Sequence, residues 1–376
     1  MKLLHTGDLH IGKRIFELSM LEEQKHVLQQ ILRIAKEEKV EAVLIAGDVY
    51  DRSVPATEAV ELLDEFLTEL VEADIKVIMI SGNHDSPERV GFASKILERQ
   101  GLHIAGTYDG TLKKVILEDE WGELEIVCLP FVKPGIVGEK NCADAVKAVL
   151  KKEEEKRGRR ILVTHYFVTG PGGKSPLLSE SETMIDVGGI DNVPVNALDG
   201  FDYVALGHIH KYQQIGKEPV YYAGTPLKYS FAEAGSEKSV NIVELCEKGN
   251  CKVSRRVLQP IHEMRCIKGK LKDLISPEVV HAQDVSPEDY IQATLTDKEE
   301  LIDPIGTLRS VYPNTLQILL EKNVSSDAEK MESRLHKEIK GLEELFADFY
   351  ELLTGEVLNE KQERIVREIM EEGELK

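Results

Sequence analysis

The chain has 376 residues, 42% of them hydrophobic and 30% charged, and its formal net charge is −20. Such a composition is typical of a globular protein with one large domain and one or two smaller parts. The acidic balance argues against a general affinity for nucleic acid, which depends on neutralising phosphates. It leaves open a local basic rim, bound cations or a positively charged partner. We expect no membrane span, no signal peptide and, from the scattered cysteines, a reducing cytoplasm.

The first third of the chain alternates apolar runs with amphipathic stretches. Apolar runs at 3–4, 40–46 and 77–80, the last of them rich in β-branched residues, are typical of buried strands. Between them, apolar residues recur at helical spacing over 18–35 and 62–70. Strand–helix–strand units of this kind predict a parallel sheet.

After residue 110 the pattern becomes mostly β. Two strands without an intervening helix are expected over 111–129, and a helix over roughly 142–157. A Gly- and Ser-rich stretch from 170 to 189 breaks all periodicity, and a loop of this length is usually functional or disordered. Further strands are predicted at 160–164, 201–206, around Val220, 239–246 and 251–258. This order predicts an α/β (α+β) fold in which two mixed β-sheets pack together with helices outside.

A shift in composition near Pro260 divides the chain into three predicted parts. Residues 1–260 would form the main domain, and 261–325 a small α/β capping domain with strands at roughly 289–296 and 314–320. Residues 326–376 are predicted to form charged helices with one apolar stripe. This stripe could fold back on the chain itself, but its Leu and Phe anchors favour docking on a partner.

Polar side chains follow five of the predicted strands at the point where each strand ends. In α/β sheets, functional sites are built at the carboxyl ends of the strands. A single Asp-x-His or a lone histidine there is commonly structural, but five such ends indicate a shared task. The side chains are Asp8 and His10, Asp48, Asn83 and His84, His165, and His208 and His210.

These residue types predict a site for two metal ions. Carboxylate and amide oxygens mixed with imidazoles suit manganese, iron or zinc better than calcium or magnesium. Seven likely ligands among these eight side chains are too many for one ion and suit two ions if one carboxylate bridges them. Sites with two metals about 3.5–4 Å apart are typical of phosphoryl-transfer enzymes.

The motifs resemble those of the calcineurin-like metallophosphoesterases, in which they occur in this order. Asp-x-His, Gly-Asp, Gly-Asn-His-Asp, a later His and Gly-His-x-His specify only this superfamily. Other segments are similar to the SbcD family, the nuclease subunits of bacterial SbcCD complexes, and the resemblance covers essentially the whole chain. Those segments are Ser179 to Glu182, Val187 to Gly189, Gly200 to His210, and Tyr222 to Ser230.

The resemblance implies a role for each of the side chains at the strand ends. His84, next in sequence to a ligand, would stabilise the transition state or protonate the leaving oxygen. Asp51 departs from archaeal and eukaryotic relatives, which carry a histidine there. It could support a ligand or be a surface turn residue, and we expect the latter. The implied ligands are Asp8, His10, Asp48 and His210 for one metal, and Asn83, His165 and His208 for the second, with Asp48 bridging.

The resemblance also implies an activity and partners. The activity is that of a manganese-dependent DNA nuclease, a 3′→5′ exonuclease on duplex ends and an endonuclease on hairpins and single strands, in DNA repair, replication and recombination. The reaction is in-line hydrolysis at phosphorus, with His84 assisting departure of the 3′-oxygen. The implied partners are double-stranded DNA ends and hairpins, an SbcC-type coiled-coil ATPase, and a second nuclease subunit within a heterotetramer.

Two other functions remain compatible with the motifs. One is a small-molecule or phosphoprotein phosphatase, and the other is a non-catalytic scaffold acting through the C-terminal helices. The long loop and the capping domain favour DNA because they add surface beside the site. Basic residues near the motifs could contact phosphates, although each alone is typical of a solvated side chain: Arg14, Lys133, Lys174, Lys211 and Lys228.

Overall fold

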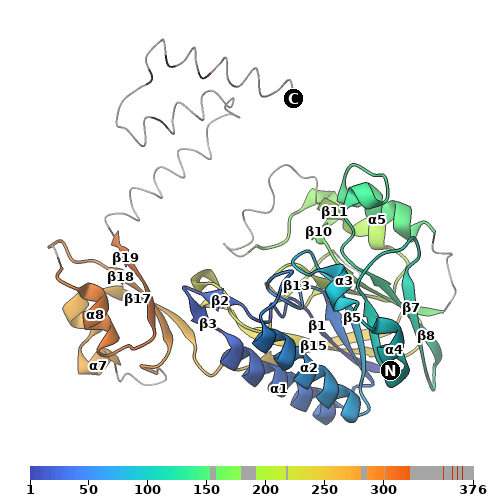
Figure 1. The fold of residues 1–376 in the computed structure, drawn as a ribbon, viewed down its shortest axis with the longest axis horizontal. Coiled ribbons are helices and arrows are strands. Elements are labelled where there is room, and N and C mark those ends of the chain that lie inside the picture. The colour runs from blue at the N-terminus through green and yellow to red at the C-terminus, as the bar shows by residue number, and fades with distance from the viewer. Residues whose placement is uncertain are drawn as a thin grey trace.

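Two six-stranded β-sheets packed against each other form the body of the molecule, with helices on the outside (Figure 1). The computed structural model describes residues 1–152, 158–178, 192–216, 219–280, 286–299 and 301–321, together with 350, 358, 362 and 366. The predicted arrangement of two mixed sheets is confirmed.

The first sheet has a parallel centre with an antiparallel edge. Strands β1, β4, β5 and β6 run parallel, and β15 and β16 continue the sheet antiparallel from β1. The strand order is β16-β15-β1-β4-β5-β6. The bounds are β1 Lys2–Thr6, β4 Ala42–Ala46, β5 Lys76–Ile80, β6 Leu102–Ala105, β15 Lys238–Leu245 and β16 Cys251–Leu258.

The second sheet has a parallel centre and an antiparallel strand at each edge. Strands β8, β9, β12 and β14 run parallel, whereas β7 and β13 pair antiparallel with β8 and β14. The strand order is β13-β14-β12-β9-β8-β7. The bounds are β7 Lys113–Asp119, β8 Gly122–Leu129, β9 Arg159–His165, β12 Tyr203–Gly207, β13 Gln213–Gln214 and β14 Val220–Tyr222.

Residues that alternate along each strand fill two different cores. On β4, Val43 and Ile45 face the helices, while Leu44 belongs to the apolar cluster between the two sheets. All five residues of β4 are buried, because parallel strands covered on both faces leave no side for water. This explains why the sequence shows continuous apolar runs here rather than alternation.

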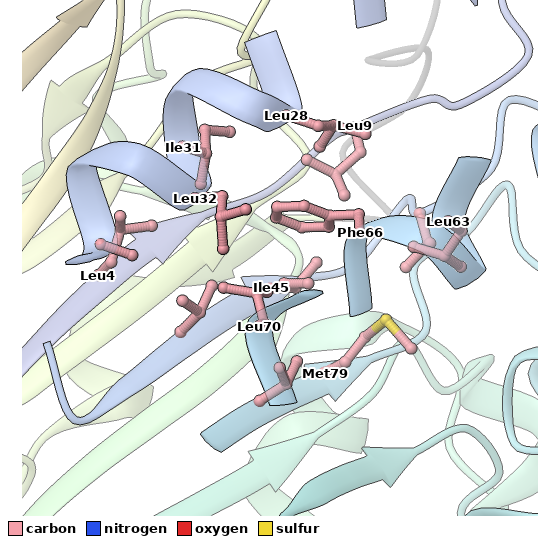
Figure 2. Packing of buried hydrophobic residues seen from close by; sticks show 14 of the residues in the cluster. Leu4, Leu9, Leu28, Ile31, Leu32, Ile45, Leu63, Phe66, Leu70 and Met79 are labelled. Carbon is pink, nitrogen blue, oxygen red and sulfur yellow. The ribbon is translucent and has the colours of Figure 1, made fainter. Parts of the chain in front are cut away.

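Helices α1 (Leu21–Glu38) and α2 (Thr57–Glu72) cover the first sheet, and α5 (Cys142–Leu150) covers the second. Phe66 on α2 lies among Leu28, Ile31 and Leu32 of α1 and residues of the sheet (Figure 2). Burial of such aliphatic and aromatic side chains contributes roughly 1.5–3 kcal/mol each. This packing fixes the strands whose ends carry the polar side chains.

Residues 264–320 form a separate three-stranded parallel sheet, which we call the cap sheet (Figure 1). Strands β18 and β19 lie where the sequence predicted them, whereas the positions of β17 and of the three short helices α6, α7 and α8 were not predicted. A small apolar cluster links this sheet to the body through Met20 and Met264. The bounds are β17 Met264–Gly269, α6 Leu271–Leu274, α7 Pro277–Val280, β18 Tyr290–Leu295, α8 Pro304–Arg309 and β19 Thr315–Leu320.

Short elements that the sequence did not indicate connect the large ones. The most consequential is the hairpin of β2 (Arg14–Ile15) and β3 (Leu18–Ser19), which follows the first polar motif. The others are α3 Pro87–Val90, α4 Ser94–Leu97, β10 Phe167–Thr169, β11 Asn192–Pro194, and the 3-10 helices η1 Glu98–Gln100, η2 Pro134–Ile136, η3 Pro171–Gly173, η4 Val195–Leu198 and η5 Phe231–Glu233.

Some predicted segments fall outside the described residues. They are the centre of the long loop, residues 179–191, and the C-terminal helices apart from four single residues. Within the described residues, α5 ends at Leu150, earlier than the predicted end near 157. No helix among the described residues is long and apolar enough to cross a membrane.

A buried ion pair in the second sheet gives a stability prediction. Arg160 Nε donates to Glu125 Oε2 at 2.9 Å, both side chains are buried, and the guanidinium lies over the Phe201 ring. Replacing Glu125 with Ala should lower the free energy of unfolding by about 3–5 kcal/mol, because it leaves a buried charge without its partner. Chemical denaturation measures this, with exposed Glu123→Ala on the same strand as the control. Equal stability of the two variants would contradict the prediction.

Candidate metal centre

The carboxyl ends of five strands from both sheets meet at one place and bring together all eight predicted side chains. Strands β1, β4 and β5 of the first sheet lead into Asp8 and His10, Asp48, and Asn83 and His84. Strands β9 and β12 of the second sheet lead into His165, and into His208 and His210.

The backbone at these strand ends is strained. Asp8, His10, Asp48 and His208 all have positive φ angles, of 51°, 44°, 46° and 100°. Residues other than glycine adopt this conformation at a cost that the surrounding structure must outweigh, and such residues cluster at functional sites. At the adjacent Gly207, a Cβ atom would overlap the backbone oxygen of Ala46, so the two sheets approach each other too closely for any side chain.

One group of ligand atoms surrounds Asn83. Its Oδ1 atom lies 2.9 Å from His165 Nε2 and 3.0 Å from His208 Nδ1. His165 Nε2 is also 3.3 Å from Asp48 Oδ2. His165 Nδ1 donates to the backbone oxygen of Ala46 at 2.7 Å, which orients Nε2 toward the group. Spacings near 3 Å are those expected between neighbouring ligands that bind one ion at about 2.1 Å.

A second group of ligand atoms surrounds His10. Its Nε2 atom lies 3.2 Å from His210 Nε2 and 3.8 Å from Asp48 Oδ2. Asp8 Oδ1 accepts a hydrogen bond from the His208 amide at 2.7 Å. The other oxygen, Asp8 Oδ2, is buried and has no hydrogen-bond partner among the residues that the structure describes. A buried carboxylate oxygen without a donor is costly, and a cation would compensate it.

Asp48 lies between the two groups. Its Oδ1 accepts from the His84 amide at 2.9 Å, and its Oδ2 faces both His165 and His10. Two clusters of residues with metal-binding geometry share this carboxylate, namely Asp8, Asp48 and His165, and His10, Asp48 and His84. The donor set therefore fits divalent metal ions, and Asp48 belongs to both clusters.

Burial and charge shift the proton affinities within the centre. Burial raises the pKa of Asp8 to about 7 and lowers the pKa of His208 to about 3. Burial also disfavours charge on His165, but the adjacent Asp48 carboxylate outweighs it and raises the pKa of His165 to about 9. Burial likewise opposes charge on Asp48, yet His165 holds the pKa of Asp48 below its usual value. The centre is thus built to hold positive charge beside Asp48.

His84 differs from the other histidines because its side chain is 40% exposed. Its ring packs edge-on against His10, with ring centroids 5.0 Å apart, and its Nδ1 lies 3.2 Å from the backbone oxygen of Asp51. Its Nε2 is 4.0 Å from Asp48 Oδ2. His84 is therefore the histidine of the centre that solvent and a substrate can reach.

Several residues that shape the centre were not singled out in the sequence. Asp85 is buried and accepts hydrogen bonds from the amides of Val49, Tyr50 and Gly82, which ties the loop after β4 to the loop after β5. In the sequence, only the position of Asp85 at the end of Gly-Asn-His-Asp indicated a role.

Nothing in the sequence marks Gln24 or Glu233 as part of the centre, because neither lies in a segment that carries one of the strand-end motifs. Gln24 on α1 donates to the His10 backbone oxygen at 2.7 Å. Glu233 is buried, pairs with Lys238 at 2.5 Å, and has Oε1 3.8 Å from His210 Nδ1. Carboxylates in this position orient metal-binding imidazoles.

Two expectations about polar residues need correction. Asp51 is not an exposed turn residue. Its side chain is only 16% exposed, pairs with Lys13 at 2.7 Å and approaches His10 Nδ1 to 3.8 Å. Lys228 is not a free surface cation either, because it pairs with Glu263 and donates to the Ala234 backbone oxygen. Arg14, Lys133, Lys174 and Lys211 are exposed.

Comparison with known protein families agrees with this geometry. Residues 1–212, more than half of the chain, match the model of the calcineurin-like phosphoesterases. The chain belongs to this family. Its fold and its phosphoesterase class follow from that membership. Residues 260–354 match a second model, the type 5 capsule protein repressor C-terminal domain of the SbcD type.

Curated relatives place the chain within one branch of this family. A protein of Staphylococcus saprophyticus, named as the D subunit of the nuclease SbcCD, is 30% identical over 394 aligned positions, which cover 99% of this chain and 100% of the relative. The protein of the same name from Staphylococcus epidermidis is also 30% identical, over 98% of each chain. The chain is therefore a metal-dependent phosphoesterase that belongs with the SbcD nuclease subunits.

Solved structures show weaker likeness. A crystal structure of a Thermus thermophilus protein covers 68% of this chain and 98% of its own, at 13% identity and a TM-score of 0.38. A dimetal phosphatase from Danio rerio covers 68% and 96%, at 11% identity and a TM-score of 0.40. Likeness at this level carries no argument about activity.

The hydrogen bonds of Asp85 give a prediction about metal affinity. Replacing Asp85 with Ala frees three buried amides and should weaken metal binding about 10- to 100-fold, because the loops that carry Asp48 and Asn83 lose their common anchor. Calorimetric titration with Mn²⁺ measures this, with exposed Asp109→Ala as the control. Unchanged affinity in a folded Asp85→Ala variant would show that the loops hold their positions without it.

Proposed function

We propose that this chain is a DNA nuclease that hydrolyses phosphodiester bonds at a binuclear metal centre, with Mn²⁺ as the resident ion. The observation that carries the proposal is the position of Asp48 Oδ2, 3.3 Å from His165 Nε2 on one side and 3.8 Å from His10 Nε2 on the other. A carboxylate shared between two nitrogen- and oxygen-rich groups is the geometry of a bridging ligand.

The two groups suggest how the ligands divide. Both groups mix imidazole with oxygen donors, which suits Mn²⁺ better than Ca²⁺ or Mg²⁺. The buried Asp8 Oδ2, which has no hydrogen-bond partner among the described residues, supports a cation beside Asp8. We assign Asp8, His10, Asp48 and His210 to one ion, and Asp48, Asn83, His165 and His208 to the other.

The reaction requires a group that reaches the substrate, and His84 fits this role. When bound, the two cations polarise a phosphoryl oxygen and lower the pKa of water. As an imidazolium, His84 would donate Nδ1–H to the Asp51 backbone oxygen, 3.2 Å away, and would carry a second proton on Nε2, which lies 4.0 Å from Asp48 Oδ2. Nε2–H is the proton donor that we propose for the departing 3′-oxygen.

The name of the relatives, D subunit of the nuclease SbcCD, supports a nucleic-acid substrate, which we take to be DNA, and a complex as the working form. In this proposal the chain acts as a 3′→5′ exonuclease on duplex ends and as an endonuclease on hairpins and single strands, in DNA repair, replication and recombination. Residues 261–325 serve as the capping domain beside the main domain, 1–260. Residues 326–376 dock on an SbcC-type coiled-coil ATPase, and two nuclease subunits pair in the heterotetramer. Such a partner would supply the positive surface that a chain of net charge −20 lacks.

Replacement of His84 with Ala tests the proposed role of this residue. Cleavage of linear duplex DNA should fall about 10²- to 10⁴-fold, because the departing oxygen loses its proton donor. Two Mn²⁺ ions per chain should still bind, since the assigned ligands are intact. Hydrolysis of bis(p-nitrophenyl) phosphate should fall much less, because p-nitrophenolate departs without a proton.

His26→Ala on helix α1 is the control for this experiment. Loss of Mn²⁺ together with cleavage would make His84 a ligand rather than a proton donor. An equal loss on both substrates would remove it from leaving-group protonation. A native chain that hydrolyses only phosphomonoesters would overturn the DNA assignment in favour of a phosphatase.

A further inference from the structure

A groove of about 590 Å³ separates the β2–β3 hairpin from the cap sheet, and no role assigned so far uses it. The hairpin lies on the side of the body that faces the cap sheet (Figure 1). The lining residues that matter here are Arg14 and Phe16 of the hairpin, Tyr229 and Phe231 of the body, and Gln292 and Gln317 of the cap sheet.

The turn of the hairpin carries a solvent-exposed aromatic ring. The Phe16 side chain is 53% exposed, although its neighbour Ile15 is buried. Phe16 and Glu17 both have positive φ angles, of 46° and 68°, and the Arg14 guanidinium donates to the Glu17 backbone oxygen across the turn. A bulky residue in this strained conformation that leaves its ring in water indicates a binding role.

The groove also contains a second aromatic ring and polar groups at its edge. The Phe231 ring lies on the inner side, with its centroid 6.0 Å from that of Phe16. Gln292 Nε2 donates to Gln317 Oε1 at 2.6 Å, so a pair of amides from neighbouring strands of the cap sheet borders the space. Arg14 is exposed and adds a positive charge at the rim.

One side chain, Tyr229, separates the groove from His10 of the metal centre. Tyr229 lines the groove, and its ring also meets the His10 ring edge-on, with centroids 5.9 Å apart. Its hydroxyl donates to the Leu9 backbone oxygen at 2.7 Å, which fixes the ring between the two places. A molecule in the groove would therefore lie on the opposite side of the Tyr229 ring from His10.

We propose that this groove holds an unpaired nucleobase of the DNA strand being cut, stacked on Phe16, with Arg14 at a neighbouring phosphate. The inference rests on the proposed nuclease function and names the feature of the substrate that the enzyme selects, a terminal nucleotide out of the duplex stack. Aromatic rings with a nearby arginine are the general means of holding unpaired bases. The amides of Gln292 and Gln317 can hydrogen-bond to base edges.

Nucleic acid is favoured over a peptide by the positive charge of Arg14 at the rim and by the position of the groove, which only the Tyr229 ring separates from His10. A DNA strand could place a phosphate at the metal centre and a neighbouring nucleotide on the groove side of Tyr229. An apolar peptide segment would cover Phe16 but would leave Arg14 and the two amides without a function.

The test compares Phe16→Ala, Phe16→Tyr and the native full-length chain. The binding probe is duplex DNA with an unpaired 3′-terminal 2-aminopurine, whose fluorescence is quenched by stacking, in EDTA to prevent cleavage. Phe16→Ala should abolish the quenching, weaken binding about 5- to 150-fold and raise the KM for cleavage of the same DNA. Phe16→Tyr should restore all three, because it keeps an aromatic face. Phe92→Ala, a change at a ring that is 80% exposed and does not line the groove, should leave all three unchanged.

Hydrolysis of bis(p-nitrophenyl) phosphate with Mn²⁺ separates this inference from the proposed function. All variants should hydrolyse it at the native rate, because it has no base to stack. Native-like quenching and KM in Phe16→Ala, with DNA cleavage intact, would overturn the groove assignment alone. A native chain that neither binds nor cuts DNA would overturn the proposed function and this inference with it. An equal loss of quenching and of binding in Phe92→Ala would show that the effect is not specific to the groove.

Discussion

The position of the Asp48 carboxylate is the constraint on which the rest of the structure depends. One oxygen is held by the His84 amide, and the other faces His165 and His10. The backbone of Gly82 lies against this carboxylate so closely that a Cβ atom would overlap it. Asp48 itself is strained, at a φ of 46°. A strained, buried carboxylate is unstable alone, so the surrounding packing must offset its cost, and bound cations would stabilise it.

The two sheets supply that packing. Strands β1, β4 and β5 bring one half of the centre and β9 and β12 the other, and the apolar cluster between the sheets fixes their relative position. Neither sheet alone carries both groups of ligand atoms. Asp85 and the close contact of Gly207 with Ala46 then fix the loops that leave the strands. The ligand side chains thus lie in one small region, but their relative positions depend on the packing of both sheets.

Strand ends were predictable from the sequence because buried parallel strands leave continuous apolar runs, and the polar residue after each run marks the edge of the sheet. Asn83 and His208 could be placed in this way. Partners from distant segments could not, since Glu233 meets His210 only through the fold. Asp51 was taken for a turn residue because its ion pair with Lys13 spans 38 positions and has no sequence pattern. The hairpin that presents Phe16 was missed because strands of two residues have no detectable period.

The central claim is that Asp48 joins two cations into one centre that cuts DNA. The most direct measurement is metal content by mass spectrometry together with Mn²⁺-dependent cleavage of linear duplex and hairpin DNA, for the native chain and for Asp48→Ala. The account predicts two ions and cleavage for the native chain, and loss of cleavage with fewer than two ions for a folded Asp48→Ala variant. Two ions and native cleavage in that variant would contradict the account.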